Sequence, residues 1–194
     1  MKSMRVTVET VRSFQFDAVV VGGGPAGCSA AIACARRGVR TLLIEKSFSP
    51  GGMGTGGLVP TWCPVHTGML TGSAREIFDA AIADMRDIPD EREEWVPIEA
   101  ESLKRTYDRL LKESGAEVWF GSMPAAAVKR ADGTIGSLAV LTVAGLVEVC
   151  AAVYIDCTGN ADLARLAGAA IRQPSVVQPG ITVLLFGERE YSGF

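Results

Sequence analysis

Two short apolar runs dominate the first part of the chain, over about residues 16–21 and 41–45. Such runs are typical of strands buried on both faces of a parallel sheet. The segment between them, from about Pro25 to Arg37, has the length of a helix, and Gly38 follows as a helix stop. Strand, helix and strand in this order predict a βαβ unit.

The pattern changes twice further along the chain. Apolar residues recur at helical spacing over about 73–85 and 101–113, which predicts two amphipathic helices. Alternating strands with the turn signals Asp132-Gly133 and Ala144-Gly145 then predict an antiparallel meander. The strands of this meander are expected over 125–130, 135–143 and 146–150, with shorter strands over 117–120, 151–155 and 181–186 and a short helix over 161–166.

Glycines follow the first apolar run at G-x-G-x-x-G spacing, at Gly22, Gly24 and Gly27. The first allows a tight turn, the second lets the backbone approach a pyrophosphate, and the third lets the helix pack closely on the sheet. The helix then directs its free N–H groups and positive dipole end at the phosphates. Glu45 ends the second strand, where a carboxylate can accept hydrogen bonds from ribose hydroxyls. This unit predicts a dinucleotide site, and the charge of Glu45 disfavours a cofactor phosphorylated at the 2′ position.

Two later motifs extend this pattern. A second glycine segment, Gly51-Gly52-Met53-Gly54-Thr55-Gly56-Gly57, lies in a long loop over 47–72, and Asp156-Cys157-Thr158-Gly159 ends a later apolar run. With the first motif and the meander, they resemble the FAD-dependent oxidoreductases that have the glutathione-reductase type of FAD-binding fold. The chain is most similar to a bacterial family whose loop reads Gly-Gly-Met-x-Thr-x-Gly, and the resemblance runs from about residue 16 onward.

The resemblance implies FAD as the cofactor and hydride transfer between a small-molecule substrate and the flavin as the reaction. It implies that the first glycine segment lines the pyrophosphate, that the second runs along it toward the flavin, and that Thr158 and Gly159 close over the phosphate side. Glu45 would bind the adenosine ribose beside Lys46, and Ala125 or Ala126 would contact adenine through its backbone. The implied cofactor-binding residues are Gly22, Gly24, Pro25, Ala26, Gly27, Glu45, Lys46, Gly52, Met53, Thr55, Ala125, Thr158 and Gly159.

The expected fold is α/β: a Rossmann-like FAD/NAD(P)-binding domain with a central parallel sheet and a three-stranded antiparallel β-meander. The length of 194 residues suits one domain. Its dinucleotide-binding core is expected over 16–61 and 115–170, with a helical insertion over 62–114. Residues 171–194 are expected to begin a truncated substrate portion.

Two features depart from the family pattern. Asn160 stands where the family has Asp, and the late Gly-Asp motif of these folds does not occur in the sequence. The family is also longer, with a C-terminal substrate portion. The chain is therefore expected to be an N-terminal piece with exposed apolar surface that favours self-association.

Composition narrows the class of protein. A net charge of −3 provides no electrostatic basis for binding nucleic acid. Residues 18–35 carry no charge, but Gly22-Gly23-Gly24-Pro25 would break a membrane-spanning or signal helix, so no membrane association is expected. The 5 cysteines form no C-x-x-C pair, which favours reduced thiols in the cytoplasm.

Cys63 and His66 lie past the second glycine segment, where the fold approaches the flavin. The thiol is a candidate substrate contact or redox partner, and the imidazole a candidate for proton transfer. The alternative for Cys63 is a small buried residue without a chemical role, and the alternative for His66 is a polar surface residue. Two ligands do not make a zinc site, so no metal is expected.

Two other functions remain open from the sequence. The chain would be a catalytically incomplete nucleotide-binding module if the absent family motifs were needed for cofactor retention. It would be an NAD(P)-dependent dehydrogenase if the first glycine motif held a nicotinamide cofactor. The colour of the protein and titration with NADH and FAD distinguish these functions from a flavoprotein.

Overall fold

The apolar run before the first glycine motif lies at the centre of a parallel sheet. The computed structural model describes residues 9–62, 70–85 and 96–172. Every residue of β2 (Ala18–Val21) and of β3 (Thr41–Ile44) is buried, as expected for strands covered on both faces. The sheet has the order β10-β2-β3-β6, where β10 is Val153–Asp156 and β6 is Glu117–Trp119.

The expected meander forms a second sheet. β7 (Met123–Lys129), β8 (Ile135–Thr142) and β9 (Gly145–Cys150) pair antiparallel, and β1 (Ser13–Gln15) adds parallel to β9. The turn between β7 and β8 has Gly133 at φ +85°, a conformation that favours glycine. The side chain of Asp132 accepts bonds from Thr134 in the same turn. The meander is therefore confirmed, with turn chemistry that the sequence already contained.

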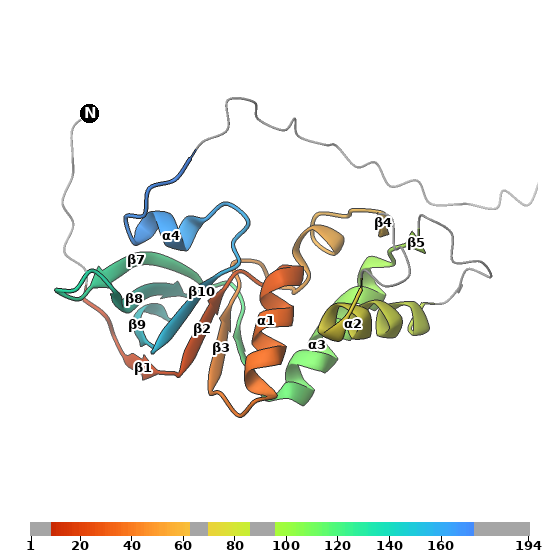
Figure 1. Cartoon of the computed structure of the whole chain (residues 1–194), viewed down its shortest axis with the longest axis horizontal. Helices are drawn as coiled ribbons and strands as arrows, with labels where there is room; N and C mark the ends of the chain where they lie inside the picture. Colours follow the sequence, from red (N-terminus) through yellow and green to blue (C-terminus); the bar gives the residue numbers. More distant parts are fainter. Residues whose placement is uncertain (1–8, 63–69, 86–95, 173–194) are drawn as a thin grey trace, which may run out of the picture.

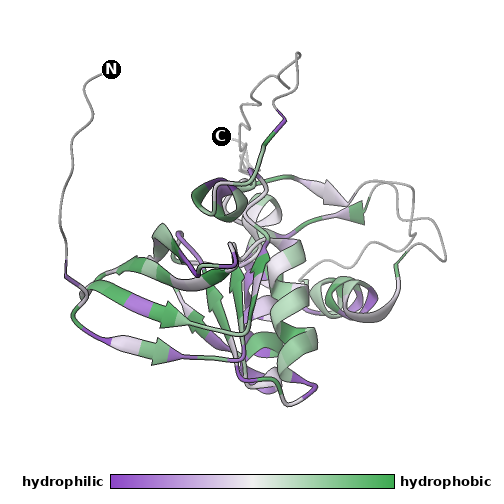
Figure 2. Cartoon of the chain, turned by 60° about the vertical axis from the view of Figure 1, so that its left-hand side comes forward, coloured by the Kyte–Doolittle hydropathy of each residue, from purple (hydrophilic) through white to green (hydrophobic). Residues whose placement is uncertain are grey.

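One large core cluster lies between the two sheets and another lies beneath the helices, and β2 contributes to both because its side chains alternate between two faces. Val19 and Val21 pack in one cluster with Leu138 and Val140 of the meander, whereas Val20 packs in a second cluster with residues of the helices. Figure 1 shows the resulting layers, with the meander on one side of the parallel sheet and the helices on the other. The strands in the interior carry mostly apolar residues, as the hydropathy colouring in Figure 2 shows.

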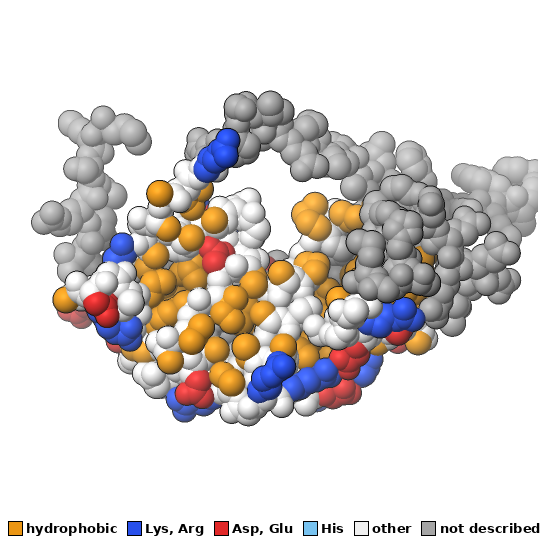
Figure 3. Space-filling view, in the orientation of Figure 1, with side chains coloured by type: hydrophobic (Ala, Val, Ile, Leu, Met, Phe, Trp, Pro, Cys, Tyr) orange, Lys and Arg blue, Asp and Glu red, His pale blue; other side chains and the backbone are white. Residues whose placement is uncertain are grey.

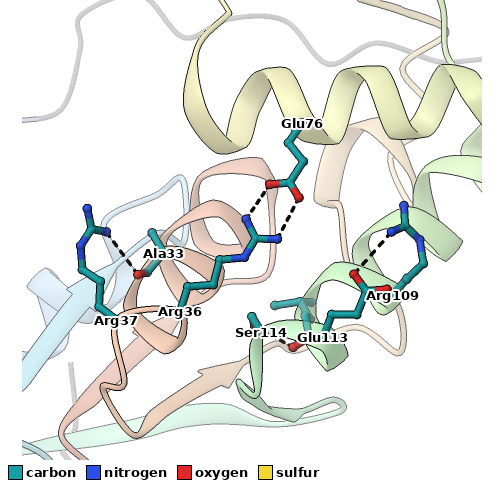
Figure 4. Close-up of polar contacts among 8 residues, drawn as sticks. Ala33, Arg36, Arg37, Glu76, Arg109, Glu113 and Ser114 are labelled. Carbon is teal, nitrogen blue, oxygen red and sulfur yellow. Dashed lines mark hydrogen bonds and ion pairs between the residues drawn. The ribbon is translucent and has the colours of Figure 1, made fainter.

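Three helices build the helical side, and a fourth follows β10. The longest, α3, has an apolar face that is buried, whereas its opposite face carries the charged side chains. Arg36, just after α1, binds Glu76 of α2 through two hydrogen bonds of 2.6 and 2.8 Å (Figure 4). Both side chains are well exposed, so this ion pair adds little to the stability of the fold. The helices are α1 (Pro25–Ala35), α2 (Gly72–Ala83), α3 (Ala100–Ser114) and α4 (Asp162–Leu166).

The structure differs from the expected elements at the first strand. The expected strand over 16–21 begins only at Ala18, and β1 precedes it in the other sheet. The N–H of Phe16 still donates to Cys150 of β9, whereas the N–H of Asp17 donates to Arg40, just before β3. The chain therefore passes from one sheet to the other at this point, which a continuous apolar run does not reveal.

The long loop over 47–72 is less irregular than expected. It contains a short 3₁₀ helix, η1 (Gly52–Gly54), and β4 (Thr61–Trp62), which pairs with β5 (Val96–Pro97). The expected strand over 181–186 lies outside the described residues. The expected boundaries of the dinucleotide-binding core, the helical insertion and the substrate portion remain predictions. In the part of the chain that the structure describes, no helix has the length and apolar character needed to cross a bilayer.

Candidate functional site

The candidate site lies where the loops after β2, β3 and β10 meet, at the carboxyl edge of the parallel sheet. The register aligns Val21 with Ile44 and Asp156, so the three strands end at the same level. The N–H of Gly51 donates to the carbonyl of Gly23 at 2.7 Å, which joins the two glycine segments. In Figure 3 this edge of the molecule, uppermost in the view, is hollowed. Ligands of open α/β sheets bind at this edge.

Two glycines of the first motif are required by the protein's own packing. Gly22 has φ +99°, and a Cβ there would lie 2.5 Å from the carbonyl oxygen of Cys157. A Cβ on Gly27 would lie 1.7 Å from the carbonyl oxygen of Gly22. Both positions therefore need glycine whether or not a ligand is bound.

Gly24 differs from these two glycines, because a Cβ there would meet no atom within 4 Å. Gly24 is the N-cap of α1, no side chain caps this end, and the first turn contains no acidic residue. A helix start with uncapped N–H groups and a positive dipole end attracts an anion. The open space before Gly24 therefore fits a pyrophosphate, with the exposed Pro25 and Ala26 on the same turn.

Glu45 is 8% exposed and has an ordering role that the sequence did not reveal. Its Oε2 accepts from the N–H of Gly23 at 2.5 Å, and its Oε1 accepts from the N–H and the hydroxyl of Ser47, both at 2.7 Å. The carboxylate thus ties the first glycine segment to the loop after β3. A carboxylate offers about four acceptor positions, so one remains for a ribose hydroxyl. The neighbouring Lys46 is exposed.

The second glycine segment lies against the first. A Cβ on Gly52 would approach the Cα of Gly24 to 3.0 Å, which places η1 beside the start of α1. Met53 is 64% exposed, whereas Thr55 is fully buried and donates its hydroxyl to the carbonyl of Pro50 at 2.6 Å. Met53 and Gly52 therefore face the surface, while Thr55 supports the segment from inside.

Asp156 organises the third loop, although no role was expected for it. Its Oδ1 accepts from the N–H and the hydroxyl of Thr158 at 3.0 and 2.7 Å, and its Oδ2 accepts from the N–H of Ala164 at 2.9 Å. The Thr158 hydroxyl also accepts from the N–H of Asp162. Gly159 has φ +77° and open space beside it. Thr158 is thus bound within the loop, and Gly159 is the member of this pair that leaves room for a ligand.

We expect Asp156→Asn to lower the free energy of unfolding at pH 7 by about 1–2 kcal/mol, because an amide cannot replace all three acceptor contacts. Burial raises the pKa of the Asp156 carboxyl, but hydrogen bonds from Ala164 and Thr158 outweigh it and hold the pKa below its usual value. A lowered pKa in the folded state stabilises the protein above the unfolded-state pKa, and this stabilisation is lost as the pH falls through the folded-state pKa. The stability difference between the wild type and the variant should therefore shrink in acid, as urea unfolding over a pH series would measure.

The matched control for this experiment is Asp132→Asn. Asp132 accepts the same pair of bonds from Thr134, but in an exposed hairpin. We expect a much smaller loss of stability there. A stability difference at position 156 that persists unchanged in acid would contradict the role of the carboxylate.

The segment after β6 lies against the loop that carries Glu45. The N–H of Glu45 donates to the carbonyl of Trp119 at 2.9 Å, and the N–H of Ser122 donates to the carbonyl of Glu45 at 3.0 Å. Met123, 49% exposed, follows directly. Ala125 is exposed at a register shift of β7, two residues or about 7 Å further along an extended strand. Met123 therefore joins Ala125 as a candidate for the backbone contact with adenine.

The expected reactive residues Cys63 and His66 lie outside the described residues. Among the described thiols, Cys28 is buried in α1 and donates to the carbonyl of Gly23 at 3.1 Å. Burial raises the pKa of its thiol to about 12. Cys28 is thus a packing residue that also holds the first glycine segment, as expected for a small apolar position.

Comparisons with known proteins show the family to which the chain belongs. The model of the family described as FAD dependent oxidoreductase matches residues 17–178. Dihydrolipoyl dehydrogenase of Chlorobaculum tepidum is 42% identical over 67 residues, which cover 34% of this chain and 13% of that protein. Digeranylgeranylglycerophospholipid reductase of Thermoplasma volcanium is 29% identical over 173 residues, or 79% of this chain and 42% of that protein.

Solved structures show the same fold. The crystal structure of THI4 from Thermovibrio ammonificans has a TM-score of 0.58 and 22% sequence identity. The similarity covers 80% of this chain and 64% of that one. The chain spans less than half the length of the two curated relatives named above.

Proposed function

Because the chain belongs to the family of FAD-dependent oxidoreductases, we propose that its three loops at the carboxyl edge of the parallel sheet hold the adenine dinucleotide part of FAD. The observation that carries this proposal is the uncapped start of α1 beside the open space at Gly24. Glu45 would bind the ribose, and Gly52, Met53 and Gly159 would lie along the phosphates toward the flavin. The first glycine motif, Glu45 and the second glycine segment then act as one surface.

The function proposed for the whole protein is hydride transfer between a small-molecule substrate and the flavin. FAD supplies the hydride-accepting chemistry when it is bound. This chain's residues bind and orient it: the start of α1 stabilises the pyrophosphate charge, and Asp156 and Thr55 keep the surrounding loops in shape. Cys63 and His66 stay hypotheses for substrate contact and proton transfer.

The direct test uses the purified 194-residue chain. A yellow preparation absorbing near ~450 nm, or uptake of added FAD by the colourless protein, is expected for a flavin site. Titration with NADH should give much weaker binding. Tight binding of NADH without flavin would instead favour a nicotinamide-dependent dehydrogenase. Weak binding of ADP alone would favour an incomplete nucleotide-binding module.

Glu45→Gln should weaken FAD binding by about 10-fold, since one charge-assisted hydrogen bond to ribose is lost. The amide also presents an NH₂ group where the carboxylate accepts from Gly23 or Ser47, which loosens the loop. Fluorescence titration of the apoprotein with FAD would measure the change. Glu113→Gln at the exposed end of α3 is the control and should bind FAD like the wild type. Equal affinities for both variants would contradict a ribose contact.

We also propose a cytoplasmic location, which the cysteines without a C-x-x-C pair support.

We propose, in addition, that the isolated chain self-associates. Apolar side chains gather on the face that Figure 3 shows. On the meander, Met123, Val128 and Leu141 are about half exposed, at 49%, 55% and 49%. Exposed apolar patches promote association. A monodisperse monomer in size-exclusion chromatography across a concentration series would contradict the self-association.

A further inference from the structure

Phe48 is the most exposed large apolar side chain in the loop after β3, at 80% of its surface. It lies three residues after Glu45, on the side of the site where the ribose is proposed to bind. Aromatic rings are large, and leaving one in water forfeits the favourable free energy of its burial. The ring is therefore accessible to a bound group, and burial against one would be favourable.

The ring is held in place through one edge. A Cβ on Gly121 would lie 2.7 Å from Cε1 and 2.9 Å from Cζ of Phe48, so the backbone of Gly121 contacts this edge of the ring. The N–H of Gly121 donates to the carbonyl of Ser47 at 3.0 Å, which joins the two segments. The Ser47 hydroxyl in turn donates to the carbonyl of Ser49 at 2.8 Å. The backbone on both sides of Phe48 is thus fixed, and the exposure of the ring leaves its faces available to a planar group.

The contacts of Glu45 next to Phe48 indicate which planar group could lie on the ring. Glu45 stands at one end of this loop, and Ser122, which donates to its carbonyl, follows Gly121 directly. A ribose bound by Glu45 carries its base on C1′, within reach of a ring three residues away. We propose that Phe48 is a positioning residue that stacks on the adenine of FAD. This inference rests on the proposed function, because it assigns the base that belongs to the ribose bound by Glu45.

Stacking makes a selective prediction. Base–aromatic stacking contributes to affinity for any ligand that carries the base, and nothing for one that lacks it. Phe48→Leu should therefore weaken binding of ADP and of FAD by about 10-fold and leave inorganic pyrophosphate unaffected. Phe48→Tyr keeps the aromatic face and should bind both nucleotides like the wild type. Val143→Leu, at an 85% exposed apolar position in the β8–β9 hairpin, is the control.

A spectroscopic readout separates stacking from support of the loop. In Phe48→Trp, ADP should quench additional indole fluorescence relative to the wild type, whereas pyrophosphate should not. Equal ADP affinity for the wild type and Phe48→Leu would overturn the inference, as would a parallel loss of ADP and pyrophosphate binding. These outcomes leave FAD binding by the wild type intact. Failure of the wild type to bind FAD would instead refute the proposed function.

Discussion

Gly24→Val should reduce FAD affinity by about 100-fold or more while the protein stays folded. The valine side chain would occupy the open space before α1, where a Cβ meets no protein atom within 4 Å. The pyrophosphate would then lose several charge-assisted hydrogen bonds to the helix start, each contributing about 1.5–3 kcal/mol. Gly24 has φ −72°, which valine adopts without strain, so the cost to folding is that of a poorer N-cap, about 1 kcal/mol.

The measurement pairs FAD titration with thermal unfolding of the apoprotein. Ala33→Val introduces the same β-branched residue into the same helix, nine residues or about 13 Å from Gly24. This control should lose a little stability and keep its FAD affinity. If Gly24→Val retained FAD as tightly as the wild type, the pyrophosphate could not lie before α1, and the proposed site would be wrong.

Gly27→Ala should act on folding and not on the ligand site. We expect a loss of about 3 kcal/mol in the free energy of unfolding. The added methyl would lie 1.7 Å from the carbonyl oxygen of Gly22 and 3.2 Å from the Cβ of Cys157. Backbone atoms cannot yield as a flexible side chain can, so α1 must move away from the sheet. Because native domains are stable by only about 5–15 kcal/mol, this loss removes a substantial share of the stability and should clearly lower the urea midpoint of unfolding.

Urea unfolding and the yield of soluble protein would measure this loss without any ligand. Ala30→Gly in the same helix is the control, since it removes a methyl group and should cost only the helix propensity, about 1 kcal/mol. A Gly27→Ala protein as stable as this control would show that α1 does not pack on Gly22 as described. Together, Gly24 and Gly27 separate the ligand requirement of the motif from its folding requirement.

Much of the fold was predictable because its signals are local. Parallel strands buried on both faces appear as apolar runs, helices as three-to-four spacing, and hairpins as Asp-Gly or Ala-Gly turns. The meander, the βαβ unit and the helices over 72–83 and 100–114 were therefore found close to their observed bounds. The family, the FAD cofactor and the oxidoreductase class followed from the order of three motifs.

The site required contacts between segments far apart in the chain. Glu45 was expected to meet only ribose, but it also binds Gly23, 22 residues earlier. Thr55 was expected along the pyrophosphate, and the structure adds that it is buried and binds the carbonyl of Pro50 in its own loop. Asp156 lies in a motif, but its role in ordering the loop was not predicted, and Phe48 lies outside every motif. Each role depends on which backbone groups the fold brings to the side chain.

By itself, the sequence determined the order of the elements and the chemistry available at the ends of the strands. It did so because local backbone preference and side-chain periodicity depend on neighbouring residues. Only the tertiary structure decided that β1 joins the meander sheet. It also decided that Gly24 borders open space at the start of α1, whereas Gly27 packs against a carbonyl oxygen. Those distinctions depend on distances between strands and loops, and G-x-G-x-x-G spacing is the same whether a Cβ would meet open space or a backbone atom.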